Sequence, residues 1–202
     1  SLPSSPILME PDPQVTTIGC YGFLLPHKGI LELIEAFSLL DHQQKEYRLL
    51  LLNSIYPVSV STDLENQCRD LINRLGLHHK VKFVTEFLPE AETLMRLSRC
   101  DLIVFPYQHT QESSSAAVRV GLATNRPVAV TPLAIFDDVA DAVFKLPGTS
   151  AREIAAGIDN LLINKEALDL KVLEAQRWVE ERHWPQLSER LLGIIDGISN
   201  SW

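Results

Sequence analysis

The chain has 202 residues, of which 46% are hydrophobic, 22% are charged and 7% are aromatic. This composition excludes a disordered tail and a fibrous repeat, and the length allows one large domain or two small ones. The 18 basic residues are outnumbered by 26 acidic ones, which gives a net charge of −8 at pH 7. An acidic chain of this kind is not expected to bind nucleic acid, although a local basic spot for one phosphate group is compatible with it.

The three cysteines are Cys20, Cys68 and Cys100, which are widely spaced and form no Cys-x-x-Cys pair. This pattern disfavours a disulfide framework or a zinc site and indicates reduced core thiols in a cytosolic protein. No apolar run approaches the about 18 residues of a membrane-spanning helix. The chain starts at Ser1 without a methionine or a signal-like segment, so we interpret it as a piece of something longer.

Along the chain, apolar runs typical of strands alternate with segments of helical period. Four prolines predict a linker over residues 1–13. The expected strands cover residues 15–21, 47–52, 81–87, 101–107 and 127–131, with 142–146 as a last short strand. The expected helices cover residues 30–40, 62–75, 89–99, 113–124 and 165–182, with another starting at Ser150 and a final one after Pro185.

Local signals predict where some of these helices begin and end. Thr62 with Glu65, and Ser150 with Glu153, have the spacing of a capping box. Gly76 is expected to supply the left-handed residue that ends the first of these two helices.

Strands that alternate with helices predict a parallel sheet with helices on both faces. The expected fold class is therefore α/β: one Rossmann-like, doubly wound domain of about five or six strands over residues 14–183, with extra C-terminal helices. Ligands of such sheets bind beyond the carboxyl ends of the strands, so the loops after the strands are the places to look for chemistry.

The first of these loops covers residues 22–29. It lacks the G-x-G-x-x-G spacing of a dinucleotide site and the Gly-Lys-Ser/Thr of a P-loop, which disfavours a dehydrogenase or a P-loop ATPase. It does place Gly22 at a strand end and Lys28 at the start of a helix, an arrangement that favours an anion. The alternative is a glycine turn with a solvated lysine.

The loop after the fourth strand leads through Glu112 into three serines, residues 113–115, at the start of a helix rich in small residues. The hydroxyls and free N–H groups there suit a phosphate, and Glu112 suits sugar hydroxyls. Glu112 is otherwise a capping acid, and Arg119 is either a phosphate partner or a surface arginine. His27 and His109 are expected at the mouth of the same cleft.

Together these features resemble the C-terminal, donor-binding domain of a family 4 glycosyltransferase, which is half of a two-domain GT-B fold. The resemblance runs through almost the whole chain and includes the terminal helices. It is carried by Gly22, Pro26 and Lys28-Gly29, by the strand at residues 81–83, by Asp101 leading a strand to Pro106, by Glu112, and by residues 126–128.

The resemblance implies a retaining hexosyltransferase that takes its sugar from a nucleotide diphosphate sugar and needs no metal or other cofactor. Its site residues would include Gly22, with Lys28 on the diphosphate and Glu112 on the sugar hydroxyls as the catalytic pair. Ser113, Ser114 and Ser115 would cradle the β-phosphate, and the backbone at Phe87 and Leu88 would receive the base.

Two positions depart from the family's pattern. Phe23 stands where the family usually has an arginine, and Val120 stands where it has a second glutamate. Our hypothesis is that Arg119, on the same helix, replaces the lost positive charge. The departures leave two alternatives open: a catalytically degenerate nucleotide-sugar-binding or interaction module, and a GT-B nucleotide-sugar epimerase.

The resemblance also implies a partner domain that this chain lacks. An N-terminal domain would bind the acceptor, a glycan or glycoconjugate in polysaccharide biosynthesis, and residues 184–202 would form a helix that crosses to it. The domain alone is expected to be inactive and cytoplasmic, with peripheral membrane association only through the missing domain.

Overall fold

The computed structural model describes residues 14–40, 45–110 and 112–182. The expected linker over residues 1–13 and the expected last helix lie outside the described residues, so the proposed domain boundaries stay predictions.

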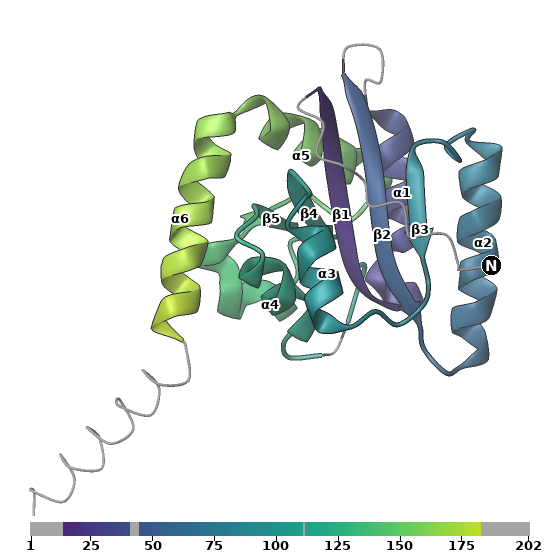
Figure 1. The fold of residues 1–202 in the computed structure, drawn as a ribbon, viewed down its shortest axis with the longest axis horizontal. Helices are drawn as coiled ribbons and strands as arrows, with labels where there is room; N and C mark the ends of the chain where they lie inside the picture. Colours follow the sequence, from purple (N-terminus) through teal and green to yellow (C-terminus); the bar gives the residue numbers. More distant parts are fainter. Residues whose placement is uncertain (1–13, 41–44, 111, 183–202) are drawn as a thin grey trace, which may run out of the picture.

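The described chain folds around one six-stranded sheet in the order β3-β2-β1-β4-β5-β6, and every pair of neighbouring strands is parallel (Figure 1). The chain turns outward in opposite directions from the neighbouring strands β1 and β4, which makes their carboxyl ends the switch point of the sheet. The strands are β1 (Val15–Leu24), β2 (Glu46–Ile55), β3 (Val81–Val84), β4 (Leu102–Phe105), β5 (Val128–Val130) and β6 (Phe144–Lys145).

Helices cover both faces of this sheet (Figure 1). On one face lie α1 (Ile30–Leu39), α2 (Ser59–Arg74) and α5 (Ala151–Ile163). On the other lie α3 (Glu90–Leu97), α4 (Ala116–Ala123) and α6 (Lys165–Glu181). Two 3₁₀ helices complete the described chain, η1 (Pro26–Lys28) and η2 (Ala134–Ala142). The expected doubly wound α/β class is therefore confirmed.

The core is split by the sheet into two apolar clusters. Leu49 and Leu51 of β2 belong to the cluster that includes residues of α1, α2 and α5, whereas Leu50 and Leu52 belong to the cluster that includes residues of α3, α4 and α6. Because alternate side chains of a strand point to opposite faces, a strand covered on both sides needs apolar residues throughout. This requirement explains the unbroken apolar runs in the sequence.

The three cysteines belong to this core. Each is a buried free thiol, and burial raises the pKa of each to about 12. None of the helices in the described part of the chain has the length and hydropathy that a bilayer span requires.

Several element boundaries differ from the sequence prediction. Helix α2 begins at Ser59, so Thr62 lies inside it and the predicted capping box there is wrong. The buried Ser61 hydroxyl instead fixes the first turn of α2: it donates to the Leu24 carbonyl at 2.7 Å and accepts from the Tyr56 N–H at 3.0 Å. Glu65 pairs with Arg69.

The other local signals are confirmed. Ser150 and Glu153 form the reciprocal capping box of α5. Gly76 has φ 67°, the left-handed conformation expected after α2. Strand β1 extends to Leu24, which places Gly22 and Phe23 at the end of the strand rather than in the following loop. The sequence did not predict η2, between β5 and β6.

Candidate functional site

The candidate site is built from two loops at the switch point, at the lower edge of the sheet in Figure 1. The first loop joins β1 to α1. Pro26 opens the short helix η1, because its ring fixes a helical φ, and Gly29 with φ 71° both ends η1 and precedes α1. A Cβ on Gly29 would lie 1.9 Å from the Pro106 carbonyl oxygen. Only glycine therefore allows this loop to approach the end of β4 so closely.

The second loop joins β4 to α4 and is bonded to the first. The Gln108 backbone N–H donates to the His27 carbonyl at 2.9 Å. The Gln108 side-chain amide donates to the carbonyls of Pro106 at 3.0 Å and Thr149 at 2.9 Å. These bonds fix the relative position of the side chains that follow in each loop.

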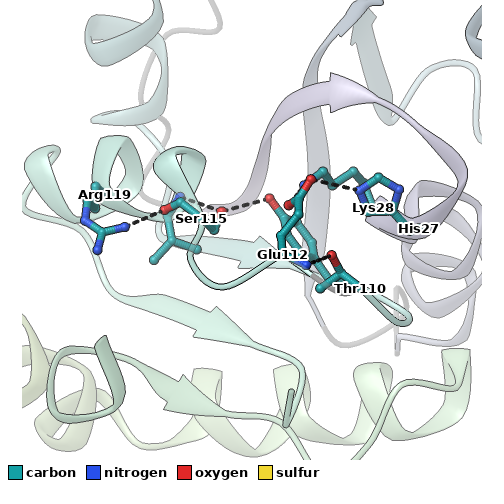
Figure 2. Close-up of polar contacts among 8 residues, drawn as sticks. His27, Lys28, Thr110, Glu112, Ser115 and Arg119 are labelled. Carbon is teal, nitrogen blue, oxygen red and sulfur yellow. Dashed lines mark hydrogen bonds and ion pairs between the residues drawn. The ribbon is translucent and has the colours of Figure 1, made fainter. Parts of the chain in front are cut away.

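At the centre of the site, Lys28 and Glu112 meet across the two loops (Figure 2). Lys28 Nζ donates to Glu112 Oε2 at 3.0 Å and lies 4.1 Å above the centroid of the Tyr107 ring. The Lys28 side chain is only 12% exposed and that of Glu112 is 49% exposed. A nearly buried ammonium group with one carboxylate partner retains donors for an anion, and the carboxylate retains oxygens for hydroxyl groups.

The Tyr107 ring lies against the ammonium group of Lys28. Its hydroxyl makes a 2.9 Å hydrogen bond with Ser115 Oγ, and burial raises the pKa of the phenol above its ordinary value. Tyr107 was not among the site residues predicted from the sequence. The sequence signal that could have identified Tyr107 is its position as an aromatic residue just after the apolar run of β4.

Helix α4 directs its N-terminus at the same place. Ser115 is its N-cap, and the serine hydroxyl accepts from the Val118 N–H. The predicted start at residue 113 is therefore two residues too early for the cap, and Ser113 and Ser114 belong to the loop. The first N–H groups of a helix lack intrahelical partners and favour an anion. Gly121 sets α4 close to the sheet, because a Cβ there would lie 2.9 Å from the Phe105 ring.

These groups open into a pocket of about 360 Å³. Its described lining includes the predicted site residues Gly22, Lys28, Phe87, Glu112, Ser114 and Ser115, together with the departures Phe23 and Val120. Tyr21, Ser54, Tyr107, Ala116 and Ala117 complete the lining. Ser113 and Leu88 are not among these residues: Ser113 is exposed, and Leu88 packs against the core.

Arg119 takes a different direction (Figure 2). Its guanidinium donates to the Ser115 carbonyl at 3.1 Å and forms an ion pair with Asp138. Arg119 is not among the residues that line the pocket. The structure therefore does not bring Arg119 together with Lys28. It does not place the guanidinium in the pocket, where the hypothesis that Arg119 replaces a lost phosphate contact requires it.

His27 lies beside the carboxylate, with Nε2 3.7 Å from Glu112 Oε1. Burial and then the charge of Lys28 lower the pKa of His27, against the opposing effect of Glu112. This shift favours the neutral imidazole over the charged one. His109 is exposed. In the described part of the chain, no group of three or more His, Cys, Asp or Glu side chains is placed to hold a metal ion.

A protein-family model described as "Glycosyl transferases group 1" matches residues 10–178. The chain belongs to this family. No curated protein matches it significantly by sequence. The solved structure of a glycosyltransferase from Rickettsia africae ESF-5 is similar, with a TM-score of 0.72 and 19% identity over 91% of this chain and 48% of that one.

Two further solved structures are similar to this chain, a member of the group 1 glycosyl transferases. Anabaena Alr3699/HepE in complex with UDP and glucose has a TM-score of 0.74 and 16% identity over 91% of this chain and 49% of that one. The C-terminal domain of the group 1 glycosyl transferase LpcC from Francisella tularensis has a TM-score of 0.69 and 16% identity, over 83% of this chain and 86% of that one.

At these identities the structural comparisons show the fold alone. The chain spans about half the length of the Rickettsia and Anabaena chains. The expected Rossmann-like fold, which matches one half of a GT-B glycosyltransferase, is thereby confirmed.

Proposed function

We propose that this chain is the C-terminal, donor-binding half of a retaining, family 4 glycosyltransferase of the hexosyltransferase type. The donor is a nucleotide diphosphate sugar, and the acceptor is a glycan or glycoconjugate bound by an N-terminal domain. The observation that carries the proposal is the Lys28–Glu112 pair beside the N-terminus of α4, inside a pocket at the switch point of the sheet. Anabaena Alr3699/HepE, of similar fold, was solved with UDP-glucose.

The two charged side chains have separate roles in this proposal. Lys28 and the α4 N-terminus bind the diphosphate, and Glu112 accepts hydrogen bonds from the sugar hydroxyls. When the bond between the anomeric carbon and the β-phosphate oxygen breaks, its electron pair stays on that oxygen. A preorganised ammonium group and helix N-terminus stabilise the charge as it develops. The acceptor oxygen forms the new bond to the anomeric carbon, and its proton leaves to a base of the N-terminal domain.

The proposal includes a cytoplasmic reaction in polysaccharide or other glycoconjugate synthesis. It needs no metal, because the lysine and the helix N-terminus face the leaving group. Membrane association, where it occurs, belongs to the N-terminal domain. The domain alone binds donor without transferring sugar.

Phe23 and Val120 favour a second candidate, a module that retains nucleotide-sugar binding without catalysis. Both side chains line the pocket, where they offer apolar surface and no charge. An epimerase of the same fold is the third possibility, and it would also require donor binding.

Calorimetric titration with UDP, GDP and ADP and with their sugar conjugates tests donor binding. We expect micromolar affinity for at least one of them and a loss of that affinity in Lys28→Ala. Lys82→Ala, at an exposed lysine of β3, is the matched control and leaves the affinity unchanged. Absence of binding by every nucleotide overturns the proposal. Transfer, measured on the longer chain that includes the N-terminal domain, separates the transferase from the inactive module.

A further inference from the structure

Tyr107 touches both groups that make the candidate site attractive to an anion. It lies two residues beyond the end of β4 and is 2% exposed, and the Thr131 hydroxyl donates to its carbonyl at 2.7 Å. Lys28 Nζ lies 4.1 Å from the centroid of its ring, and its hydroxyl makes a 2.9 Å hydrogen bond with Ser115 Oγ. One buried side chain therefore contacts both the lysine and the N-cap of α4.

The Tyr107 ring is itself held by other rings. Its centroid lies 5.1 Å from that of Phe136, and Phe105 and His27 approach it edge-to-face at 6.3 Å and 6.4 Å. Burial raises the pKa of the phenol, so the hydroxyl keeps its proton and is able to donate as well as to accept. A ring packed in this way is a fixed support for the groups on its face and at its hydroxyl.

Lys28 benefits from such a support because a lysine side chain is long and has many rotamers. Ordering it only when an anion arrives would cost conformational entropy. Glu112 and the Tyr107 ring both attract the ammonium group, but they differ in charge. The carboxylate neutralises the ammonium group, whereas the ring has no net charge. Tyr107 therefore orients the positive charge of Lys28 and leaves that charge available to an anion.

The Tyr107 hydroxyl has the matching effect on helix α4. Ser115 Oγ binds the Tyr107 hydroxyl and also accepts from the Val118 N–H in the first turn of the helix. A serine hydroxyl with two partners has a fixed orientation, so the turn that it caps is fixed relative to Tyr107. The free N–H groups of this turn are the ones that favour an anion.

Resting on the proposed function, we infer that Tyr107 is a positioning residue that holds the Lys28 ammonium group and the N-terminus of α4 in one fixed arrangement. The ring acts through Lys28, and the hydroxyl acts through Ser115. The diphosphate then meets two anion-binding groups that are already aligned, so less entropy is lost when it binds. Loss of Tyr107 weakens phosphate binding although Lys28 and Ser115 are both still present.

Calorimetric titration of Tyr107 variants with inorganic pyrophosphate and UDP tests this inference. Tyr107→Leu removes the ring and the hydroxyl and is expected to weaken both ligands about 3- to 30-fold, the range of a cation–π contact. Tyr107→Phe keeps the ring and is expected to lose about threefold, because only the hydrogen bond to Ser115 is removed. Phe37→Leu is the matched control: it removes a buried ring of α1 on the other face of the sheet. It is expected to lower the free energy of unfolding and to leave both affinities unchanged.

A spectroscopic measurement separates positioning from a general loss of stability. Protons that lie above an aromatic ring resonate upfield, so the Lys28 Hε signals of the ligand-free chain are expected upfield of those of an ordinary lysine. The upfield shift is expected to persist in Tyr107→Phe and in Phe37→Leu and to vanish in Tyr107→Leu. Lys28 Hε signals at ordinary positions in the wild-type chain would overturn the inference.

The outcomes separate this inference from the function on which it rests. If the wild-type chain binds neither pyrophosphate nor any nucleotide, the proposed function fails and the inference fails with it. If both ligands bind and a folded Tyr107→Leu retains their affinities, only the inference is overturned. Equal losses of affinity in Phe37→Leu and Tyr107→Leu also overturn it, because the ring would then act through stability alone. Should Tyr107→Leu not fold, Tyr107→Phe decides: a loss of about threefold supports the inference, and unchanged affinities overturn it.

Discussion

The described chain has a pocket at each edge of its sheet, and the smaller one is the candidate site. The pocket at the carboxyl edge has a volume of about 360 Å³, and the pocket at the amino edge has about 640 Å³. The amino-edge pocket is also richer in charge. Its charged lining residues are Lys45, Asp101, Arg126, Lys165 and Asp169.

The two pockets differ in what their charged side chains already bind. At the amino edge, Asp101 accepts from the Thr17 N–H at 2.7 Å, and Arg126 Nε donates to the Ser98 carbonyl at 2.5 Å. These groups stabilise the backbone around them. At the carboxyl edge, Lys28 and Glu112 bind each other. Volume and charge alone therefore do not locate the site, whereas strand direction and the partners of each charge do.

The largest expected effect concerns the close contact between Gly29 and Pro106 at the carboxyl edge. Gly29→Ala introduces a Cβ 1.9 Å from the Pro106 carbonyl oxygen, at a residue with a left-handed φ. Relieving this clash requires the backbone of one of the two loops to move. We expect the free energy of unfolding to fall by about 3 kcal/mol in urea denaturation. Gly76→Ala, with a similar φ and nothing within 4 Å, is the control and is expected to cost about 1 kcal/mol. Equal losses in both variants would show that the close approach to Pro106 is unimportant.

A pair of cation variants tests the comparison directly. Lys28→Ala is expected to weaken nucleotide-sugar binding by about 10- to 100-fold, since a hydrogen bond to a charged group is worth about 1.5–3 kcal/mol. Arg126→Ala is expected to leave that affinity unchanged and to lower the free energy of unfolding, because the Ser98 carbonyl loses its donor. Calorimetry and urea denaturation on both variants provide the measurements. The reverse pattern would assign ligand binding to the amino edge.

Glu112→Gln separates the two roles within the site. Removing the carboxylate frees Lys28 from its partner, so the affinity for UDP is expected to rise by up to about fivefold, the equivalent of a partly exposed ion pair. The additional affinity that a sugar conjugate has over UDP is expected to fall. Glu166→Gln, on an exposed glutamate of α6, serves as the control. An unchanged ratio of the two affinities would remove Glu112 from sugar recognition.

The smallest expected effect belongs to Arg119. Its guanidinium binds Asp138 and the Ser115 carbonyl at a partly exposed position, so Arg119→Ala is expected to change donor affinity by less than about twofold. Asp138→Asn is expected to behave alike. A loss comparable to that of Lys28→Ala in calorimetry would support the sequence hypothesis that Arg119 contacts the phosphate.

Much of the fold was predictable because the signals were local or periodic. The apolar runs marked all six strands, and Ser150 with Glu153 marked the start of α5. The start of α2 was not predictable, because the Ser61 hydroxyl acts through Leu24, 37 residues away in the chain. The local capping signal of Thr62 with Glu65 predicted a later start, but the tertiary contact of Ser61 accompanies a helix that begins at Ser59.

The site was predictable to the level of loops but not of every side chain. Strand order and the rule for parallel sheets brought Lys28 and Glu112 together, although they are 84 residues apart. The direction of Arg119 depended on Asp138, which lies in a segment with no predicted structure. Tyr107 was missed because its contact with Lys28 exists only once the two loops meet.

The most direct test of the central claim is an amide chemical-shift map of the chain titrated with UDP and UDP-glucose. Ligand binding at the Lys28–Glu112 pocket predicts that the largest shifts fall on Gly22, Phe23 and residues 114–117. Largest shifts at Lys45, Arg126 and Lys165 would place the ligand at the opposite edge of the sheet and contradict the proposed function.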